Sequence, residues 1–243
     1  MDQPLTVAYA CNRAFYQWMP MAVGSLLRHN PDAQVLIYAE DDKIPEIKHS
    51  HVQIININSI PQFVPDDSPN ATTKFTKFAL VRCYFPKILN YDKILWLDAD
   101  TIVLKPLDEL WNIDISRTFV AGVMDIPAIG FHELGEIQIN KYINTGVLLM
   151  NLKMMRQYNI SDKIIKLLKG PRMLYPDQDA INVTCYPLIK LIDPKFNCGS
   201  ITPHFTRVIK DPVIRHYTYT KLWDDPDIKI WRDYYIPELK EGD

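Results

Sequence analysis

Residues 93–104, KILWLDADTIVL, decide the fold that we expect for this chain. In this segment an apolar run leads directly into Asp98 and Asp100, which are separated only by Ala99. Short apolar runs that end in polar, turn-forming residues are typical of buried strands. Open α/β sheets gather their ligands where the strands end. The segment is therefore predicted to be a strand that delivers two carboxylates to the carboxyl edge of a sheet.

Five other segments have the same strand-like character and alternate with helical patterns. They are LTVAYA from Leu5, QVLIYA from Gln34, VQIINI from Val52, FVAGVM from Phe119 and TGVLLMNL from Thr145. Between the first two, apolar residues recur at helical spacing from Trp18 to Leu26. This alternation predicts an α/β protein with a mixed sheet flanked by helices.

Two further helices and one loop are expected. Residues 74–89 have a helical apolar face, which Pro86 should kink or end. A second helix should begin with Ser161 as its N-cap and stop at Gly170. The polar, proline-rich residues 61–71 are expected to form a long loop.

Length and composition exclude several classes of protein. The 243 residues, 47% of them hydrophobic, are enough for one substantial core, so a single domain over 1–243 is expected. A net charge of -2 gives no overall attraction to nucleic acid or to an anionic membrane. The 4 cysteines form no C-x-x-C pair and are predicted to be free, buried thiols. There is no signal-like leader and no apolar stretch of membrane-spanning length, so we expect a cytoplasmic protein without an integral membrane segment.

The two strand-end aspartates point to a cation. In an extended chain alternate side chains share a face, with the two α-carbons about 6.6 Å apart. Two like charges at the end of a buried strand are unfavourable unless something compensates them. Carboxylates favour Mg²⁺ or Mn²⁺, and an additional imidazole would favour Mn²⁺. In the alternative interpretation, Asp98 and Asp100 simply cap the following turn.

The segment YDKILWLDADTIVLKPLDELW resembles the retaining glycosyltransferases of family 8, which include glycogenin and bacterial lipopolysaccharide galactosyltransferases. Other blocks typical of this family follow in the family's order, namely YINTGVLLMNL, PDQDAIN and HYTYTKLW. The resemblance extends from about residue 5 to 223. It implies a single-domain, Rossmann-like GT-A fold, with a nucleotide-binding part over about 1–105 and an acceptor and sugar part over about 106–243.

The resemblance also implies roles for individual residues. Asp98, Asp100 and His216 would bind Mn²⁺, with Mg²⁺ as the alternative, and Lys221 would stabilise the departing diphosphate. Asp177, Gln178 and Lys221 would be the catalytic residues. Donor binding would involve Ala10, Asn12, Phe15, Arg82, Asp98, Ala99, Asp125, Asn144, Thr145, Gly146, Asp177, Gln178 and Lys221.

Simpler structural interpretations stay open for several of these residues. Arg82 could form a surface ion pair, and Asn144 could merely satisfy backbone groups at a strand end. Asp177 could cap a helix, with Asp179 as an additional acidic neighbour. For retention of configuration, Gln178 favours front-face transfer because an amide is a poor nucleophile, while Asp177 remains the alternative nucleophile.

The chain departs from the family pattern at two places. Asn12 stands where the family usually has an aspartate that reads uracil, which makes uridine the first choice among bases rather than a certainty. In HYTYTKLW, Tyr219 and Leu222 replace the glycine and proline that the family prefers.

The predicted function is transfer of a hexose from UDP-glucose or UDP-galactose to a saccharide, glycolipid or protein acceptor. A glycogenin-like enzyme that glycosylates itself and a non-catalytic nucleotide-sugar-binding protein are the alternatives. A nucleotidyltransferase is disfavoured because residues 10–20, ACNRAFYQWMP, contain no glycine for a phosphate loop. Formation of a homodimer stays open.

Overall fold

The chain divides into two compact units, each made of separate stretches of sequence. The computed structural model describes residues 3–44, 47, 49–71, 77–126, 128, 141–199, 209 and 211–218. Unit 1 comprises Met1–Ser59, Leu97–Ile113 and Asp193–Asp243, and unit 2 comprises Ile60–Trp96 and Asp114–Ile192. These boundaries differ from the predicted division near residue 105. The single domain over the whole chain stays a prediction.

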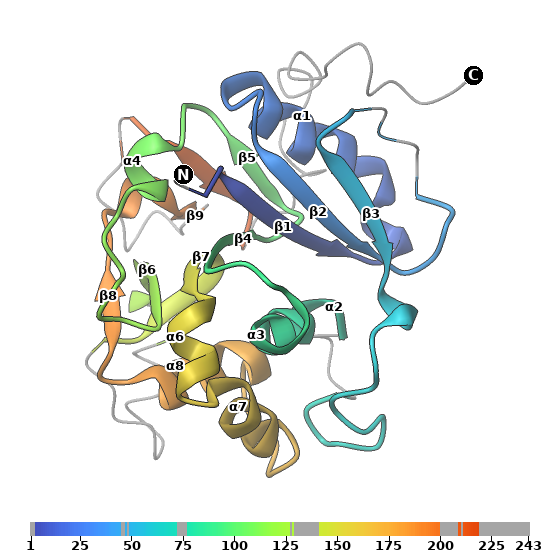
Figure 1. Cartoon of the computed structure of the whole chain (residues 1–243), viewed down its shortest axis with the longest axis vertical. Coiled ribbons are helices and arrows are strands. Elements are labelled where there is room, and N and C mark those ends of the chain that lie inside the picture. Colours follow the sequence, from blue (N-terminus) through green and yellow to red (C-terminus); the bar gives the residue numbers. More distant parts are fainter. Residues whose placement is uncertain are drawn as a thin grey trace. The chain divides into compact units, whose positions relative to one another are not determined.

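Unit 1 contains three parallel strands, β1 (Thr6–Cys11), β2 (Gln34–Ala39) and β3 (Val52–Asn56), in the order β3-β2-β1. They are the blue strands of Figure 1, which lie side by side. Every residue of β1 is buried, which explains its continuous apolar sequence. A short 3-10 turn, η1 (Arg13–Trp18), leads from β1 into helix α1 (Met19–His29). The predicted strands and the helix between them are confirmed.

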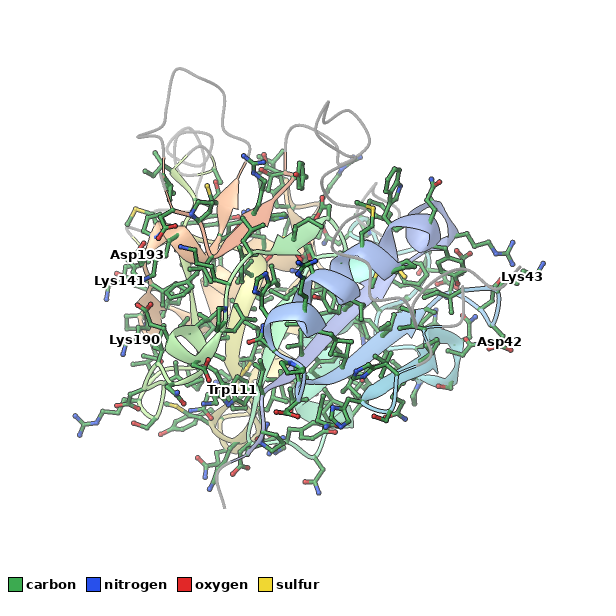
Figure 2. All side chains as sticks on the ribbon, turned by 90° about the horizontal axis from the view of Figure 1, so that it is seen from above. Asp42, Lys43, Trp111, Lys141, Lys190 and Asp193 are labelled. Carbon is green, nitrogen blue, oxygen red and sulfur yellow. The ribbon has the colours of Figure 1, made fainter. Side chains whose placement is uncertain are left out.

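A second, three-stranded sheet in unit 1 has the order β5-β10-β9. Its strands are β5 (Thr101–Val103), β9 (Cys198–Gly199) and β10 (Ile214–His216). The short elements η2 (Ile57–Ser59), α4 (Asp108–Trp111) and η4 (Pro194–Phe196) complete the described part of the unit. The Trp111 indole, labelled in Figure 2, donates to the Gln3 carbonyl over 3.3 Å and ties α4 to the start of the chain.

Unit 2 contains β4 (Lys93–Leu97, whose last residue belongs to unit 1), β6 (Val120–Met124), β7 (Ile143–Asn151) and β8 (Ile189–Leu191). Their order is β4-β7-β6-β8. Strand β6 pairs antiparallel with β7 and parallel with β8, so the strand arrangement is mixed. The predicted mixed α/β class is confirmed.

The helix predicted over residues 74–89 is divided into three short pieces. Within its described part, α2 (Lys77–Leu80) is followed by the 3-10 turn η3 (Val81–Tyr84) and by α3 (Phe85–Ile88). Pro86 lies in the first turn of α3. It has no amide proton for an α-helical bond to the carbonyl of Arg82, which accounts for the tighter turn before it.

The predicted N-cap at Ser161 is wrong. Helix α7 (Ile160–Leu168) begins one residue earlier, and its N-cap position is Asn159 with φ 52°. Ser161 is buried, and its hydroxyl donates to the Cys83 carbonyl over 2.8 Å. Because this tertiary contact uses the hydroxyl, the side chain does not cap the helix. The predicted stop near Gly170 is confirmed, since α7 ends at Leu168.

Residues 61–71 form the expected loop, which is fastened to the end of α7. The Ser68 hydroxyl donates to the Leu168 carbonyl over 2.6 Å. The Asn70 amide donates to the carbonyls of Leu168 and Pro171 over 3.1 and 2.9 Å. Both side chains are buried, so this loop has a fixed conformation at its anchor.

All four cysteines are free, as predicted, and the predicted burial is confirmed for Cys11, Cys83 and Cys185 but wrong for Cys198, which is partly exposed. Burial, with a smaller contribution from Glu40, raises the pKa of Cys11 to about 12. No helix among the described ranges is both long and apolar enough to cross a bilayer. The cytoplasmic location stays a prediction.

Two more helices, α6 (Leu152–Gln157) and α8 (Pro176–Cys185), belong to unit 2. Asn182 connects α8 to β7. Its Oδ1 accepts from the Ile143 amide over 2.8 Å, and its Nδ2 donates to the carbonyls of Ile143 and Gln178, also over 2.8 Å. Asn182 is fully buried, so no water can replace these bonds.

We expect Asn182→Ala to lower the free energy of unfolding by about 2–4 kcal/mol, because it leaves the backbone groups of Ile143 buried without this partner. Urea unfolding followed by circular dichroism measures the change. The control is Val183→Ala on the same helix, where the side chain is 38% exposed and the expected change is within about 0.5 kcal/mol. Equal stability of Asn182→Ala and the wild type would contradict the role of this side chain.

Candidate active site

The two strand-end aspartates lie in a turn of unit 1. Strand β4 ends at Leu97, and the chain turns through Asp98, Ala99 and Asp100 before β5. The Asp98 carbonyl accepts from the Thr101 amide over 3.1 Å and from its hydroxyl over 2.7 Å. The extended geometry predicted for Asp98 and Asp100 is therefore wrong, because Thr101 closes the turn.

Strand pairing brings a histidine from far along the sequence to this turn. Strand β10 pairs antiparallel with β5 so that His216 lies opposite Thr101. The amide of Tyr217 donates to the Asp100 carbonyl over 2.9 Å. Both contacts use backbone groups, so they fix the register that places His216 beside the two aspartates.

The three predicted metal ligands form a compact cluster. His216 Nε2 lies 3.7 Å from Asp98 Oδ2 and 3.3 Å from Asp100 Oδ1. One potential ligand atom from each residue lies within 4.8 Å of the other two. The imidazole is 3% exposed, and the carboxylates of Asp98 and Asp100 are 29% and 15% exposed. A cation bound here would have protein ligands on its buried side and could bind a further ligand on its exposed side.

Asn197, which the sequence analysis missed, fixes the state of this imidazole. Its Oδ1 lies 2.9 Å from His216 Nδ1 and can only accept, so Nδ1 carries the proton and Nε2 faces the aspartates. A protonated Nε2 would pair directly with the two carboxylates, whereas a deprotonated Nε2 would share a cation with them. Two carboxylate oxygens and one imidazole nitrogen suit Mn²⁺, and a second partner on the imidazole is usual at metal sites.

The predicted nucleotide-side residues Ala10, Asn12 and Phe15 lie at the end of β1 and in η1. The Asn12 carbonyl accepts from the Phe15 amide over 3.0 Å. Its side-chain Oδ1 is buried and has no hydrogen-bond partner within the described part of the chain.

Two acidic residues after β2 hold the turn at Arg13. The Arg13 amide donates to Glu40 over 3.0 Å, and its guanidinium forms an ion pair with Asp41. The Asp41 amide in turn donates to the Tyr16 hydroxyl over 2.9 Å. Figure 2 marks the next two residues of this loop, Asp42 and Lys43. These contacts fasten η1 to the end of β2.

Unit 2 gathers a second set of predicted residues into a polar network. Asp125 directly follows β6, and its Oδ2 accepts from Asn144 Nδ2 over 3.1 Å and from Gln178 Nε2 over 3.0 Å. Asn144 Oδ1 accepts from the Gly146 amide over 2.9 Å. Asn144 thus satisfies a backbone group, as its simpler interpretation required, and also holds Asp125.

Arg82 and Asp177 form a buried pair in unit 2. Arg82 Nη2 lies 3.4 Å from Asp177 Oδ2, and the two side chains are 3% and 5% exposed. The guanidinium also donates to the Thr145 carbonyl and lies 4.2 Å from the Trp96 ring centroid. The Thr145 hydroxyl donates to Asp177 Oδ2 over 3.4 Å. The surface ion pair considered for Arg82 is therefore wrong, since the pair is buried.

Asp177 does not cap its helix. The N-cap position of α8 is Tyr175, and Asp177 lies within the first turn. It is Asp179 whose Oδ2 accepts from the Tyr175 amide, over 2.9 Å. Asp179 Oδ1 accepts from the Tyr142 hydroxyl. Tyr142 had not been singled out, because a tyrosine at the start of an apolar strand looks like an ordinary core residue.

The remaining predicted residues are Ala99, which is buried in the turn between the two aspartates, and Lys221. Lys221 lies outside the described residues, as do the two departures Tyr219 and Leu222.

Comparison with known proteins gives the chain a family context. The family model described as glycosyl transferase family 8 matches residues 6–227. A Haemophilus influenzae protein provisionally named a glycosyltransferase is 25% identical over 213 residues, covering 81% of this chain and 64% of that protein. A lipopolysaccharide 1,2-glucosyltransferase of Escherichia coli is 30% identical over 162 residues, covering 59% and 46%. The chain thus spans less than two thirds of either relative.

Among solved structures, an active-site mutant of LgtC superimposes with a TM-score of 0.72 at 17% sequence identity. The match covers 95% of each chain. At this identity the likeness concerns the fold alone.

We expect Asp100→Ala to weaken Mn²⁺ binding by at least about 100-fold, because it removes a ligand from the cluster. Asn197→Ala should weaken binding by about 10- to 100-fold without removing a ligand, since it frees the imidazole to rotate. Electron paramagnetic resonance titration measures free Mn²⁺. The control is Asp211→Ala, which removes an 81% exposed carboxylate from the same unit and should bind Mn²⁺ normally. Wild-type affinity in Asp100→Ala would exclude this cluster as the metal site.

Proposed function

Because the chain belongs to glycosyl transferase family 8, we propose that it transfers a hexose from a nucleotide diphosphate sugar to a hydroxyl acceptor with retention of configuration. The predicted GT-A type fold is confirmed by the likeness to LgtC. Uridine diphosphate glucose or galactose is the proposed donor, and Mn²⁺ is the proposed metal.

One observation carries the proposal. In unit 1 the carboxylates of Asp98 and Asp100 and the Nε2 atom of His216 converge within 4.8 Å, and Asn197 holds the other ring nitrogen. Two carboxylates and an imidazole brought together by strand pairing can bind a divalent cation, and three protein ligands leave coordination positions for phosphate oxygens. This arrangement supports a metal that binds a diphosphate. A non-catalytic nucleotide-sugar-binding protein could use the same cluster, so hydrolysis of the donor in the presence of Mn²⁺ distinguishes it from an enzyme.

The bound cation would stabilise the negative charge that collects on the diphosphate as it leaves. Two contacts within the chain hold the proposed ligands in the arrangement that the cation would need. Asn197 keeps His216 in the tautomer that can ligate, and the Thr101 turn keeps Asp98 and Asp100 on the same side. Lys221 is proposed to add positive charge near the leaving group, on the basis of the family resemblance.

The polar network of unit 2 is proposed to recognise the sugar. Asp125, Asn144 and Gln178 are bound to one another, so their positions are fixed before any ligand arrives. Preorganised hydroxyl-binding groups can distinguish one hexose from its epimers. Arg82 supports this network through its contacts with Asp177 and the Thr145 carbonyl.

We propose front-face transfer for the retaining reaction. The bond between the anomeric carbon and the phosphate oxygen breaks with its electron pair going to the diphosphate. The acceptor oxygen bonds to the same face of that carbon, and its proton passes to the departing phosphate. The alternative nucleophile, Asp177, already has Oδ2 beside Arg82 and the Thr145 hydroxyl, which lowers its nucleophilicity.

Uracil is the proposed base because the family resemblance gives the position of Asn12 the role of reading the base, and an asparagine Oδ1 can accept the N3–H of uracil. The acceptor is proposed to be a saccharide, with a glycolipid or protein hydroxyl as alternatives. Self-glycosylation is a second candidate within the family, and intact-mass measurement after incubation with donor distinguishes it from transfer to another molecule.

A thermal-shift panel tests the donor and the metal together. We expect uridine diphosphate glucose or galactose to raise the melting temperature by several degrees with Mn²⁺ and by much less without it, because binding to the native state stabilises it. Guanosine and adenosine diphosphate sugars serve as controls for the base. Donor hydrolysis or transfer should require Mn²⁺ and be lost in Asp100→Ala. Metal-independent turnover, or a preference for a purine nucleotide, would contradict the proposal.

Arg82→Lys tests the sugar-side role. Lysine keeps the charge near Asp177 but cannot reproduce the forked contacts of the guanidinium, so we expect kcat/KM for the donor to fall about 10- to 100-fold. Mn²⁺ affinity should stay within about twofold, because the metal cluster uses other residues. A matched control is Arg28→Lys, a helix-end arginine in unit 1. Unchanged donor kinetics would remove Arg82 from the donor site.

A further inference from the structure

The side-chain amide of Gln178 has almost all of its hydrogen-bonding capacity used inside the protein. Its Oε1 accepts from the Thr145 amide over 3.0 Å. Its Nε2 donates to Asp125 Oδ2 over 3.0 Å and to the Tyr142 hydroxyl oxygen over 3.3 Å. A carboxamide has two N–H donors and two oxygen lone pairs. Within the described residues, these bonds leave one lone pair on Oε1 that a ligand can use.

The orientation of this amide is decided by its neighbours. The two ends of a carboxamide have similar shapes, so hydrogen bonds must select one orientation. The Thr145 amide can only donate, and a carboxylate such as Asp125 can only accept, so both favour the observed orientation. Tyr142 is different, because a hydroxyl can either donate or accept.

Asp179 determines whether the Tyr142 hydroxyl donates to Gln178 or accepts from it. The Tyr142 hydroxyl donates its proton to Asp179 Oδ1, which leaves a lone pair of the hydroxyl oxygen for the Nε2 group of Gln178. Asp179 Oδ2 is held by the Tyr175 amide over 2.9 Å. Burial and the negative charge of Asp179 raise the pKa of Tyr142, so its proton stays in place.

Exposure of this chain of contacts to solvent is very low. Tyr142 and Asp179 are each 1% exposed, and Gln178 is 8% exposed. Water therefore cannot replace a lost partner easily, and each bond constrains the next.

We propose that Tyr142 and Asp179 are positioning residues that hold Gln178 with its carbonyl oxygen, rather than its amide nitrogen, available to the donor sugar. This inference rests on the proposed function. The anomeric carbon becomes positively charged as the diphosphate leaves, so an oxygen lone pair stabilises it and an N–H group would oppose it. A reversed amide would thus place the wrong polarity at the reacting centre.

Two substitutions separate this role from simple packing. Tyr142→Phe removes the acceptor for Gln178 Nε2 and keeps the ring. Asp179→Asn should lower kcat at least as much. The Tyr175 amide can only donate, so it would bind the asparagine Oδ1, and the asparagine Nδ2 would then donate to the Tyr142 hydroxyl. The Tyr142 proton would then turn toward Gln178, where the observed orientation presents an N–H group.

We expect each variant to lower kcat roughly 10- to 100-fold, while KM for the donor and Mn²⁺ affinity stay within about twofold. In a Gln178→Ala background, Tyr142→Phe should have no further effect, because it acts through Gln178. Tyr158→Phe, which alters a 53% exposed tyrosine of unit 2, is the control and should retain full activity. Wild-type kcat in Tyr142→Phe, or an additive loss in the Gln178→Ala background, would overturn the proposal.

A second measurement needs no donor. The side-chain amide protons of Gln178 should exchange slowly with solvent in ¹⁵N nuclear magnetic resonance spectra, and one of them should exchange much faster in Tyr142→Phe. Unchanged exchange would overturn the proposed orientation. If the wild type turns over no nucleotide sugar, the proposed function is wrong. The exchange measurement still tests whether Tyr142 and Asp179 hold the side-chain amide of Gln178.

Discussion

The candidate active site of unit 1 depends on one backbone pairing, that of β5 with β10. This pairing places His216 opposite Thr101, immediately after the Asp98–Asp100 turn. A shift of one residue would turn the imidazole to the other face of the strand, away from both carboxylates. Two further backbone bonds reinforce the register, from Tyr217 to Asp100 and from Leu104 to Val213. The proposed metal ligands are thus held by main-chain geometry, which side-chain changes nearby disturb little.

The carboxylates of the two units have different surroundings, which indicates that they have different roles. In unit 2, Asp125, Asp177 and Asp179 accept from amide or hydroxyl groups, or lie beside Arg82. These bonds fix shape and leave little capacity for a new charge. In unit 1 the imidazole Nε2 of His216 lies 3.7 Å from Asp98 Oδ2 and 3.3 Å from Asp100 Oδ1. That arrangement suits a divalent cation, so unit 1 is where we propose that the metal and the diphosphate bind.

The sequence predicts most strands and, through the family resemblance, the three residues of the Asp98–Asp100–His216 cluster, but not how the cluster is built. The sequence alone predicts β1 and β2 because both faces of these strands are buried, which gives each strand a continuous apolar run. The ligand role of His216 came from the family resemblance, since its distance from Asp98 along the chain carries no local signal. Turn geometry was misjudged where a hydroxyl had a competing partner, as at Thr101 and Ser161. Asn197 and Tyr142 were missed because their partners are remote in sequence.

The same pattern explains why the supporting residues are harder to predict than the ligands. A ligand must have a particular chemistry, so its residue type is restricted and its motif is visible. A supporting residue must only supply a donor or an acceptor at a point fixed by the fold, and asparagine, tyrosine or a backbone amide can each do so. Asn197 gives His216 its tautomer, and Tyr142 with Asp179 gives Gln178 its orientation. In both cases a buried group that can adopt two states is confined to one, and the chemistry proposed for each site requires that state.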